Sequence, residues 1–172
     1  MDESEATDAP AYSPNAIHLM RTTQLAHFQL SAMADQKASI LMGASFVIFT
    51  ITVGQARGAA APLALLILGG FAFLSAVCAV MAVLPSSGPR RKAPRNLLFF
   101  GSFTELDEDE FVERITARLA TDDAIYRTMA HDIYQNGCVL RHKKYRMLGW
   151  AYRIFLVGLV ASAAAFVLEA WR

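Results

Sequence analysis

Two clusters of basic side chains are the part of this sequence best suited to bind a ligand. The first cluster contains Arg90, Arg91, Lys92 and Arg95, followed by the amide of Asn96 and the rings of Phe99 and Phe100. The second contains Arg141, His142, Lys143, Lys144 and Arg146, with the ring of Tyr145 among them. Arginine and lysine bind phosphate through charge-assisted hydrogen bonds, and an aromatic ring can stack on a base. These residue types predict a site for an anion that carries both a phosphate group and a base. The alternative is a membrane boundary, where cations stay on the cytoplasmic side and attract anionic lipid.

Helical spacing selects the residues of the second cluster that can face one ligand. Arg141 lies three residues before Lys144 and four before Tyr145, so each pair shares one face of an α-helix. The predicted ligand site therefore combines these three side chains with three from the first cluster: Arg91, Arg95 and Asn96.

Nothing typical of an enzyme accompanies these clusters. The four histidines form no metal-ligand spacing: His18, His27, His131 and His142. His131 and Asp132 are adjacent, but neighbours on a helix point about 100° apart, which fits a solvated face. Cys78 and Cys138 are interpreted as ordinary apolar side chains. We expect no catalytic residue, metal or cofactor. The net charge of +1 gives no reason to expect a nucleic-acid partner, and a small lipid-modifying enzyme is the weakest alternative.

The elements that must position these clusters are membrane helices. Hydrophobic residues make up 55% of the 172-residue chain. Three charge-free stretches approach the roughly 20 residues that cross a bilayer as a helix. We predict an all-α membrane protein with three transmembrane helices, at residues 38–56, 62–85 and 147–170. Small residues recur three or four apart in the second and third spans, which predicts close helix packing, either within one chain or between copies.

The distribution of cations predicts the topology. Arg57 is the single cation between the first two spans, whereas eleven cations lie between the second and third. Positive charge stays on the cytoplasmic side, so the N-terminus is expected inside and the C-terminus outside.

The remaining segments are predicted to form a cytoplasmic helical stalk. Residues 1–14 are acidic and predicted to be disordered. Apolar residues then recur at helical spacing over residues 15–37, which predicts an amphipathic helix that continues into the first span: Ile17, Met20, Leu25, Phe28, Ala32 and Met33. Within the basic and helical region 86–146, Asp107 and Glu110 resemble a capping box, and Thr121 starts a helix that runs unbroken into the third span.

Five short segments, in order and spacing, resemble the Pycsar effector transmembrane family: Asp35 to Leu41, Asn96 to Gly101, Glu110-Phe111, Asp132-Ile133-Tyr134 and Lys144 to Leu148. The resemblance covers about residues 35–165. Four positions match the family's motifs without assigned roles: Lys37, Asn96, Lys144 and Tyr145.

The resemblance implies an antiphage effector of the bacterial inner membrane that is not an enzyme. A partner cyclase would supply a cyclic pyrimidine mononucleotide, cUMP or cCMP, and the effector would then damage the lipid bilayer. Three helices are too few to enclose a pore, so we also expect a homo-oligomer. The alternative is a small membrane scaffold or anchor subunit that binds no nucleotide.

Overall fold

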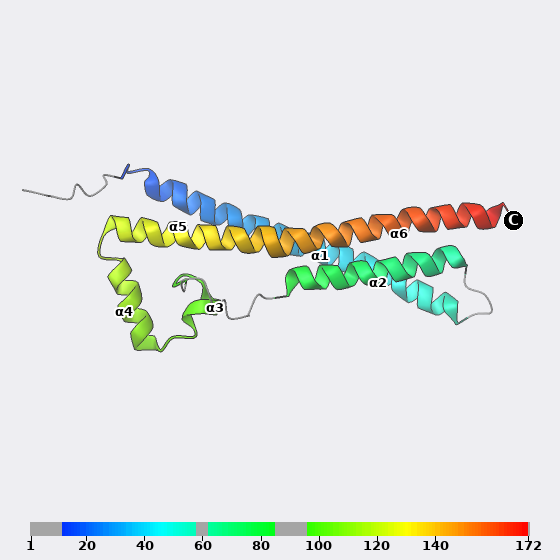
Figure 1. Ribbon diagram of the computed structural model, residues 1–172, viewed down its shortest axis with the longest axis horizontal. Coiled ribbons are helices and arrows are strands. Elements are labelled where there is room, and N and C mark those ends of the chain that lie inside the picture. Colours follow the sequence, from blue (N-terminus) through cyan, green and yellow to red (C-terminus); the bar gives the residue numbers. More distant parts are fainter. Residues whose placement is uncertain (1–11, 58–61, 85–95, 172) are drawn as a thin grey trace, which may run out of the picture. The chain divides into compact units, whose positions relative to one another are not determined.

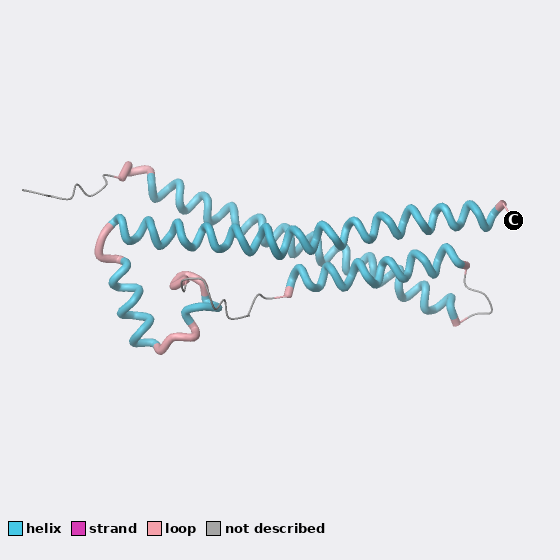
Figure 2. The backbone as a smooth tube through the Cα atoms, in the orientation of Figure 1, coloured by secondary structure: helices cyan, strands magenta, loops and turns pink. Residues whose placement is uncertain are grey.

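The computed structural model describes residues 12–57, 62–84 and 96–171, and these residues form helices joined by short loops, without a strand (Figure 2). In chain order the helices are α1 (Ala16–Ala56), α2 (Leu63–Val83), α3 (Phe100–Phe103), α4 (Glu108–Arg118), α5 (Asp122–Val139), the π-helix η1 (Leu140–Tyr145) and α6 (Arg146–Ala170). The expected all-α class is confirmed for this part of the chain.

Three of the described helices are long and apolar enough to cross a membrane. They are α1, α2 and the continuous helix formed by α5, η1 and α6. Two sequence predictions are thereby confirmed: the helix after Asn15 runs without a break into the first span, and the helix after Thr121 runs into the third. The helix α2, at Leu63–Val83, lies within the residues 62–85 predicted for the second span, and residue 85 lies outside the described residues.

Contacts divide the described chain into two compact units. The first contains residues 12–28 and 96–137, and the second contains residues 29–57, 62–84 and 138–171.

In the second unit, α2 lies alongside α6 through small side chains (Figure 1). The hydroxyl of Ser75 donates to the carbonyl of Ala151 at 2.8 Å, and Ser162 donates to Ala64 at 2.7 Å. Gly158 is buried, and a Cβ placed there would meet the side chain of Phe71. The small residues predicted to allow close packing therefore meet within one chain, because small side chains let helix backbones approach.

The α1 helix joins this packing through a narrow stripe. Its buried residues are Ala34, Ala38, Leu41, Ser45 and Thr52. Three of them share a core with residues of α2 and α6: Ala34, Ala38 and Leu41 with Ala79, Ala82, Leu148 and Ala151. The side chain of Thr52 occupies the space beside Gly69 on α2.

In the first unit, the helix starts agree with the sequence, but one predicted cap is wrong. Asp107 precedes α4 without a side-chain capping bond, and Glu110 pairs with Arg114 instead of reaching back. Thr121 does cap α5, because its hydroxyl accepts the backbone N–H of Ala124 at 3.2 Å.

The apolar periodicity of residues 15–37 predicted the helix but not its buried face. The side chains of Leu25 and Phe28 are 62% and 67% exposed, and Met33 is exposed as well. Ile17 and Met20, from the same set, are half-buried. Spacing alone therefore located the helix, but it did not show which of these apolar residues have neighbours.

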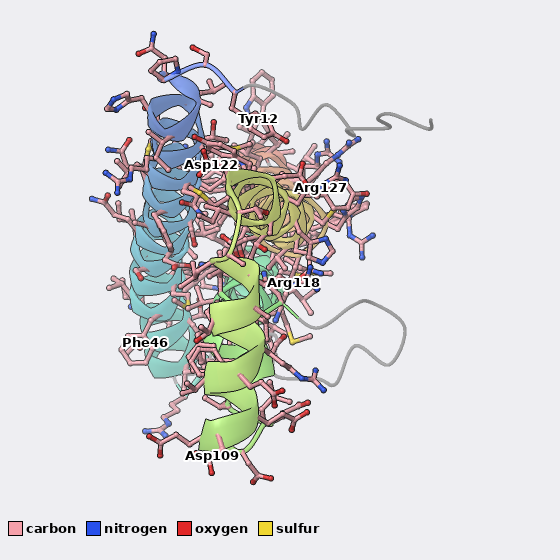
Figure 3. All side chains as sticks on the ribbon, turned by 90° about the vertical axis from the view of Figure 1, so that its left-hand side faces the viewer. Tyr12, Phe46, Asp109, Arg118, Asp122 and Arg127 are labelled. Atoms are coloured by element: carbon pink, nitrogen blue, oxygen red, sulfur yellow. The ribbon has the colours of Figure 1, made fainter. Side chains whose placement is uncertain are left out.

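Tyr12, near the end of the segment predicted to be disordered, contacts α5. Its hydroxyl donates to Asp123 at 2.7 Å, and its ring lies 4.6 Å from that of Tyr126. Figure 3 shows Tyr12 close to the start of α5 and to Arg127. The hydrogen bond from Tyr12, followed by the guanidinium of Arg127, holds the pKa of Asp123 below its usual range. Residues 1–11 lie outside the described residues.

Candidate functional site

Apart from Arg146, which begins α6, the second basic cluster lies in a π-helix, η1, at Leu140–Tyr145. Such a segment has a wider turn than an α-helix, and single-turn π segments occur frequently at functional sites. Arg141, Lys144 and Tyr145 all fall within it. These residues were expected to share one face because of α-helical spacing, and the wider turn changes the angles between them. No residue pattern in the sequence predicts the wider turn of a π-helix.

Lys144 is the best-connected residue of the predicted site. Its ammonium group lies 2.7 Å from both carboxylate oxygens of Asp35 and 2.8 Å from the hydroxyl of Ser31, both on α1. The side chain of Lys144 is 19% exposed and that of Asp35 is 41% exposed. The pair therefore stays accessible to solvent while it joins η1 to α1.

Neighbouring side chains add further contacts to this junction. Lys143 donates to the carbonyl of Leu84 at 2.5 Å, and the hydroxyl of Tyr145 donates to the carbonyl of Leu30 at 3.3 Å. Arg141 is exposed, and it makes no ion pair within the described part of the chain. Two segments, α1 and the end of α2, thus contact η1 here, while the guanidinium of Arg141 remains available to an anion.

Asn96 has a different environment, in the first unit. It is 2% exposed, and its amide donates to the Asp132 carboxyl at 2.8 Å. Asp132 is 5% exposed and accepts two more amide hydrogen bonds, from Gln24 at 3.1 Å and Asn136 at 3.0 Å. The Asn96 side-chain oxygen accepts the backbone N–H of Leu98. Asn96 is therefore an internal anchor, with both ends of its side chain occupied.

The buried position of Asp132 corrects one sequence interpretation. His131 and Asp132 were assigned to a solvated face, but Asp132 faces the interior and His131 hydrogen-bonds to Gln135. Neighbours on a helix do point apart, as expected. The interpretation failed because two of the three amide donors, Gln24 and Asn96, come from segments distant in the sequence, and only Asn136 is a helical neighbour.

The remaining predicted residues are placed as follows. Lys37 is exposed, and its backbone carbonyl accepts a hydrogen bond from Tyr152 at 3.3 Å. Arg91 and Arg95 lie outside the described residues. Within the described ranges, no group of three His, Cys, Asp or Glu side chains could hold a metal ion.

Asp35 and Asp132 are the functional candidates that sequence reasoning missed. Both belong to segments that resemble the family, yet neither was assigned a partner. Asp35 offered a signal, because it is the only acidic residue between Asp8 and Glu105 and stands three positions before a charge-free span. A carboxylate in that position needs a cation or hydrogen-bond donors nearby. Asp132 offered no comparable signal.

Comparisons with known proteins identify the family of this chain. Residues 18–169 match the model of the Pycsar effector protein domain. The Pycsar effector protein PtPycTM of Propioniciclava tarda is 32% identical over 100 residues, which cover 56% of this chain and 48% of that protein. The chain thus matches about half the length of this curated relative. No solved structure matches. Because the family model covers most of the sequence, the chain belongs to the Pycsar effector domain family.

Proposed function

We propose that this protein is an antiphage effector that senses a cyclic pyrimidine mononucleotide, cUMP or cCMP, and then disrupts the inner membrane. The match to the Pycsar effector domain over residues 18–169 carries the proposal. Three helices able to cross a membrane give it a direct means of acting on the bilayer. The activity needs no catalytic group, so we propose a ligand-gated rather than an enzymatic mechanism.

The proposed ligand site centres on η1. Arg141 supplies an exposed guanidinium, Lys144 an ammonium group, and Tyr145 a ring whose hydroxyl is already engaged with α1. Guanidinium and ammonium groups bind phosphate by charge-assisted hydrogen bonds, and the tyrosine ring offers a surface for a base. The contribution of Arg91, Arg95 and Asn96 stays a prediction from the sequence, because the two arginines lie outside the described residues and Asn96 belongs to the first unit.

The Asp35–Lys144 pair suggests how binding would reach the membrane helices. A phosphate that engages Lys144 competes with the Asp35 carboxylate for the same ammonium hydrogens. Partly exposed ion pairs contribute little net stability, so the exchange costs little. Loss of the pair would weaken the junction of α1 with η1, which also includes the Tyr145–Leu30 hydrogen bond, and favour an arrangement that no longer seals the bilayer. A ligand shifts such an equilibrium only by its different affinity for the two states.

We further propose that the N-terminus and the first unit are cytoplasmic, where a partner cyclase would release the nucleotide. The one-against-eleven division of cations supports this orientation. Reporter fusions test it: a C-terminal fusion should be active outside the cytoplasm, and a C-terminal fusion active only in the cytoplasm would contradict the three-span topology.

The proposal is tested by titrating the purified full chain with cUMP, cCMP, cAMP and cGMP. The same nucleotides are then added to dye-loaded vesicles that contain the protein. We expect binding and dye release with a pyrimidine nucleotide, and loss of both in Lys144→Glu, which remains inserted. Absence of binding to all four nucleotides would instead support a membrane scaffold whose basic residues serve topology and lipid attraction.

A further inference from the structure

Both ends of α2 are bound by charged side chains of one other helix. At the start of α2, the backbone N–H of Leu63 donates to the carboxylate of Glu169 at 2.9 Å. At its end, the ammonium group of Lys143 donates to the carbonyl of Leu84 at 2.5 Å. Glu169 lies in the last turn of α6 and Lys143 in η1, so both belong to the continuous helix of α5, η1 and α6. All four residues are in the second unit.

The signs of the two charges suit the two helix ends. A helix leaves backbone N–H groups without partners at its start and carbonyls without partners at its end. Its dipole favours an anion at the start and a cation at the end. No charged residue occurs from Leu63 to Leu84, and lipid offers the backbone no hydrogen bond. Glu169 and Lys143 therefore supply the partners that the sequence of α2 lacks.

The hydrogen bonds between α2 and its neighbour are concentrated at the start of α2. Close to the Glu169 contact, the carbonyl of Ala64 accepts from Ser162, and further along α2 Ser75 donates to Ala151. Beyond Ser75, the described residues give α2 one more hydrogen bond to another helix, the one from Lys143. Loss of the Lys143 contact therefore loosens the end of α2 and leaves its start attached.

The two contacts also differ in their access to a ligand at η1. The acceptor of Lys143 is a carbonyl without net charge, so a phosphate competes for the same ammonium group with added Coulomb attraction. Lys143 adjoins Lys144, which binds the carboxylate of Asp35 on α1. Glu169 lies roughly seven helical turns further along the same helix, out of reach of a nucleotide at η1.

We propose that Lys143 is a positioning residue that holds the end of α2 and releases it when η1 binds an anion, while Glu169 keeps the start of α2 in place. A phosphate at η1 takes the ammonium group of Lys143 from the Leu84 carbonyl, and α2 then pivots about its start. One anion that engages both lysines thus loosens two membrane helices, α1 at Asp35 and α2 at Leu84. The release step rests on the proposed ligand site, whereas the two contacts of α2 do not.

Distances between paired spin labels test the two contacts in the full chain, in vesicles without nucleotide. Both native cysteines are first replaced by alanine. The pair Met81→Cys and Trp150→Cys then reports on the end of α2, and the pair Leu66→Cys and Val160→Cys reports on its start. All four labelled positions are exposed, so the labels have room.

Lys143→Met removes the ammonium group and keeps an apolar side chain. We expect it to broaden the distances at the end of α2 only, with the separated arrangement about fivefold more populated, because one hydrogen bond is lost. Lys143→Arg keeps a cationic donor and should restore the parent distances, whereas Glu169→Ala should broaden the distances at the start of α2. Parent-like distances in Lys143→Met, or equal broadening at both pairs, would overturn the proposal.

Dye release distinguishes this proposal from the proposed ligand response. Lys143→Met should release dye faster than the parent before any nucleotide is added, because one contact of α2 is already lost, and Lys143→Arg should not. If cUMP or cCMP acts on the parent but Lys143→Met seals as the parent does without nucleotide, the role of Lys143 is wrong and the ligand response stands. If no nucleotide acts on the parent, the ligand response fails, and the spin-label distances still decide whether Lys143 and Glu169 position α2.

Discussion

Asp132 and Asp35 each connect a long helix to a distant segment of the family motifs, but their surroundings differ. Asp132, in the first unit, is 5% exposed and accepts hydrogen bonds from three neutral amides. Asp35, in the second unit, has a 41% exposed side chain and pairs with the ammonium of Lys144. A buried group with satisfied donors fixes structure, whereas an accessible ion pair can exchange its partner. The segments that match the family motifs thus contain a buried anchor in one unit and a solvent-accessible ion pair in the other.

Removing the anchor should have the largest effect. Asp132→Ala leaves the amides of Asn96, Gln24 and Asn136 without their acceptor in a buried position. Unsatisfied buried donors are costly, so we expect a loss of about 3 kcal/mol in unfolding free energy. That loss corresponds to a melting temperature lower by roughly 6–12 °C. His131→Ala is the control, since His131 bonds only to Gln135 in the described chain. Similar melting temperatures for the two variants, measured by circular dichroism in detergent, would refute the anchor.

A second comparison uses two glycines of α6 to test whether tight packing of α6 on α2 is needed for the stability and activity of the second unit. Gly158→Leu would push against Phe71, whereas Gly149→Leu has open space. Overpacking typically costs about 1–3 kcal/mol, so only Gly158→Leu should melt earlier and release less dye. Insertion of both variants is checked by membrane fractionation. If both variants behave as the parent does, the packing of α6 on α2 is not needed for activity.

Breaking the accessible pair should cost less than breaking the anchor. Asp35→Asn and Lys144→Gln each remove a partly exposed ion pair, which is worth at most about 1 kcal/mol. Melting temperatures in low and high salt give the measurement, and salt should reduce the difference from the parent. A loss as large as that of Asp132→Ala would mean that this pair is also an anchor.

The smallest expected effect is on the pH dependence of stability, through the exposed contact of Tyr12, Asp123 and Arg127. The hydrogen bond from Tyr12 and the charge of Arg127 lower the pKa of Asp123, so its contribution to stability is present above the unfolded value of about 3.9. That contribution is lost as the pH falls through the lower pKa of the folded state. Asp123→Asn should therefore remove a small acid-dependent part of the melting curve. An unchanged pH profile in this variant would show that the contact does not contribute.

Much of the fold could be predicted from the sequence because the lipid environment leaves little choice. A charge-free stretch must be helical to satisfy its backbone, and no proline interrupts residues 16–56 or 122–170. The small residues of α2 and α6 indicated close packing, because small side chains let the backbones of membrane helices approach. Exposure of Leu25 and Phe28 was not predictable, because apolar spacing does not say which face has a neighbour.

The candidate site was harder to predict because its contacts join residues far apart in sequence. Lys144 and Asp35 are separated by 109 positions, and Asn96 and Asp132 by 36. Residue type indicated that Lys144 can hold an anion, but not that a carboxylate already occupies it. The π-helix also escaped prediction, since it changes the spacing between Arg141, Lys144 and Tyr145 without a distinctive residue pattern.

The most direct test of the account is calorimetric titration with cUMP and cCMP. Four proteins are titrated: the parent, Asp35→Asn, Lys144→Gln and the double variant Lys143→Gln, Lys144→Gln. If Lys144 exchanges Asp35 for the phosphate of the ligand, Lys144→Gln should bind at least about tenfold more weakly, a difference of about 1.4 kcal/mol. Asp35→Asn should bind as tightly as the parent or more tightly, because its lysine is no longer paired. If the double variant Lys143→Gln, Lys144→Gln binds the nucleotide as the parent does, the site and its coupling to α1 are wrong.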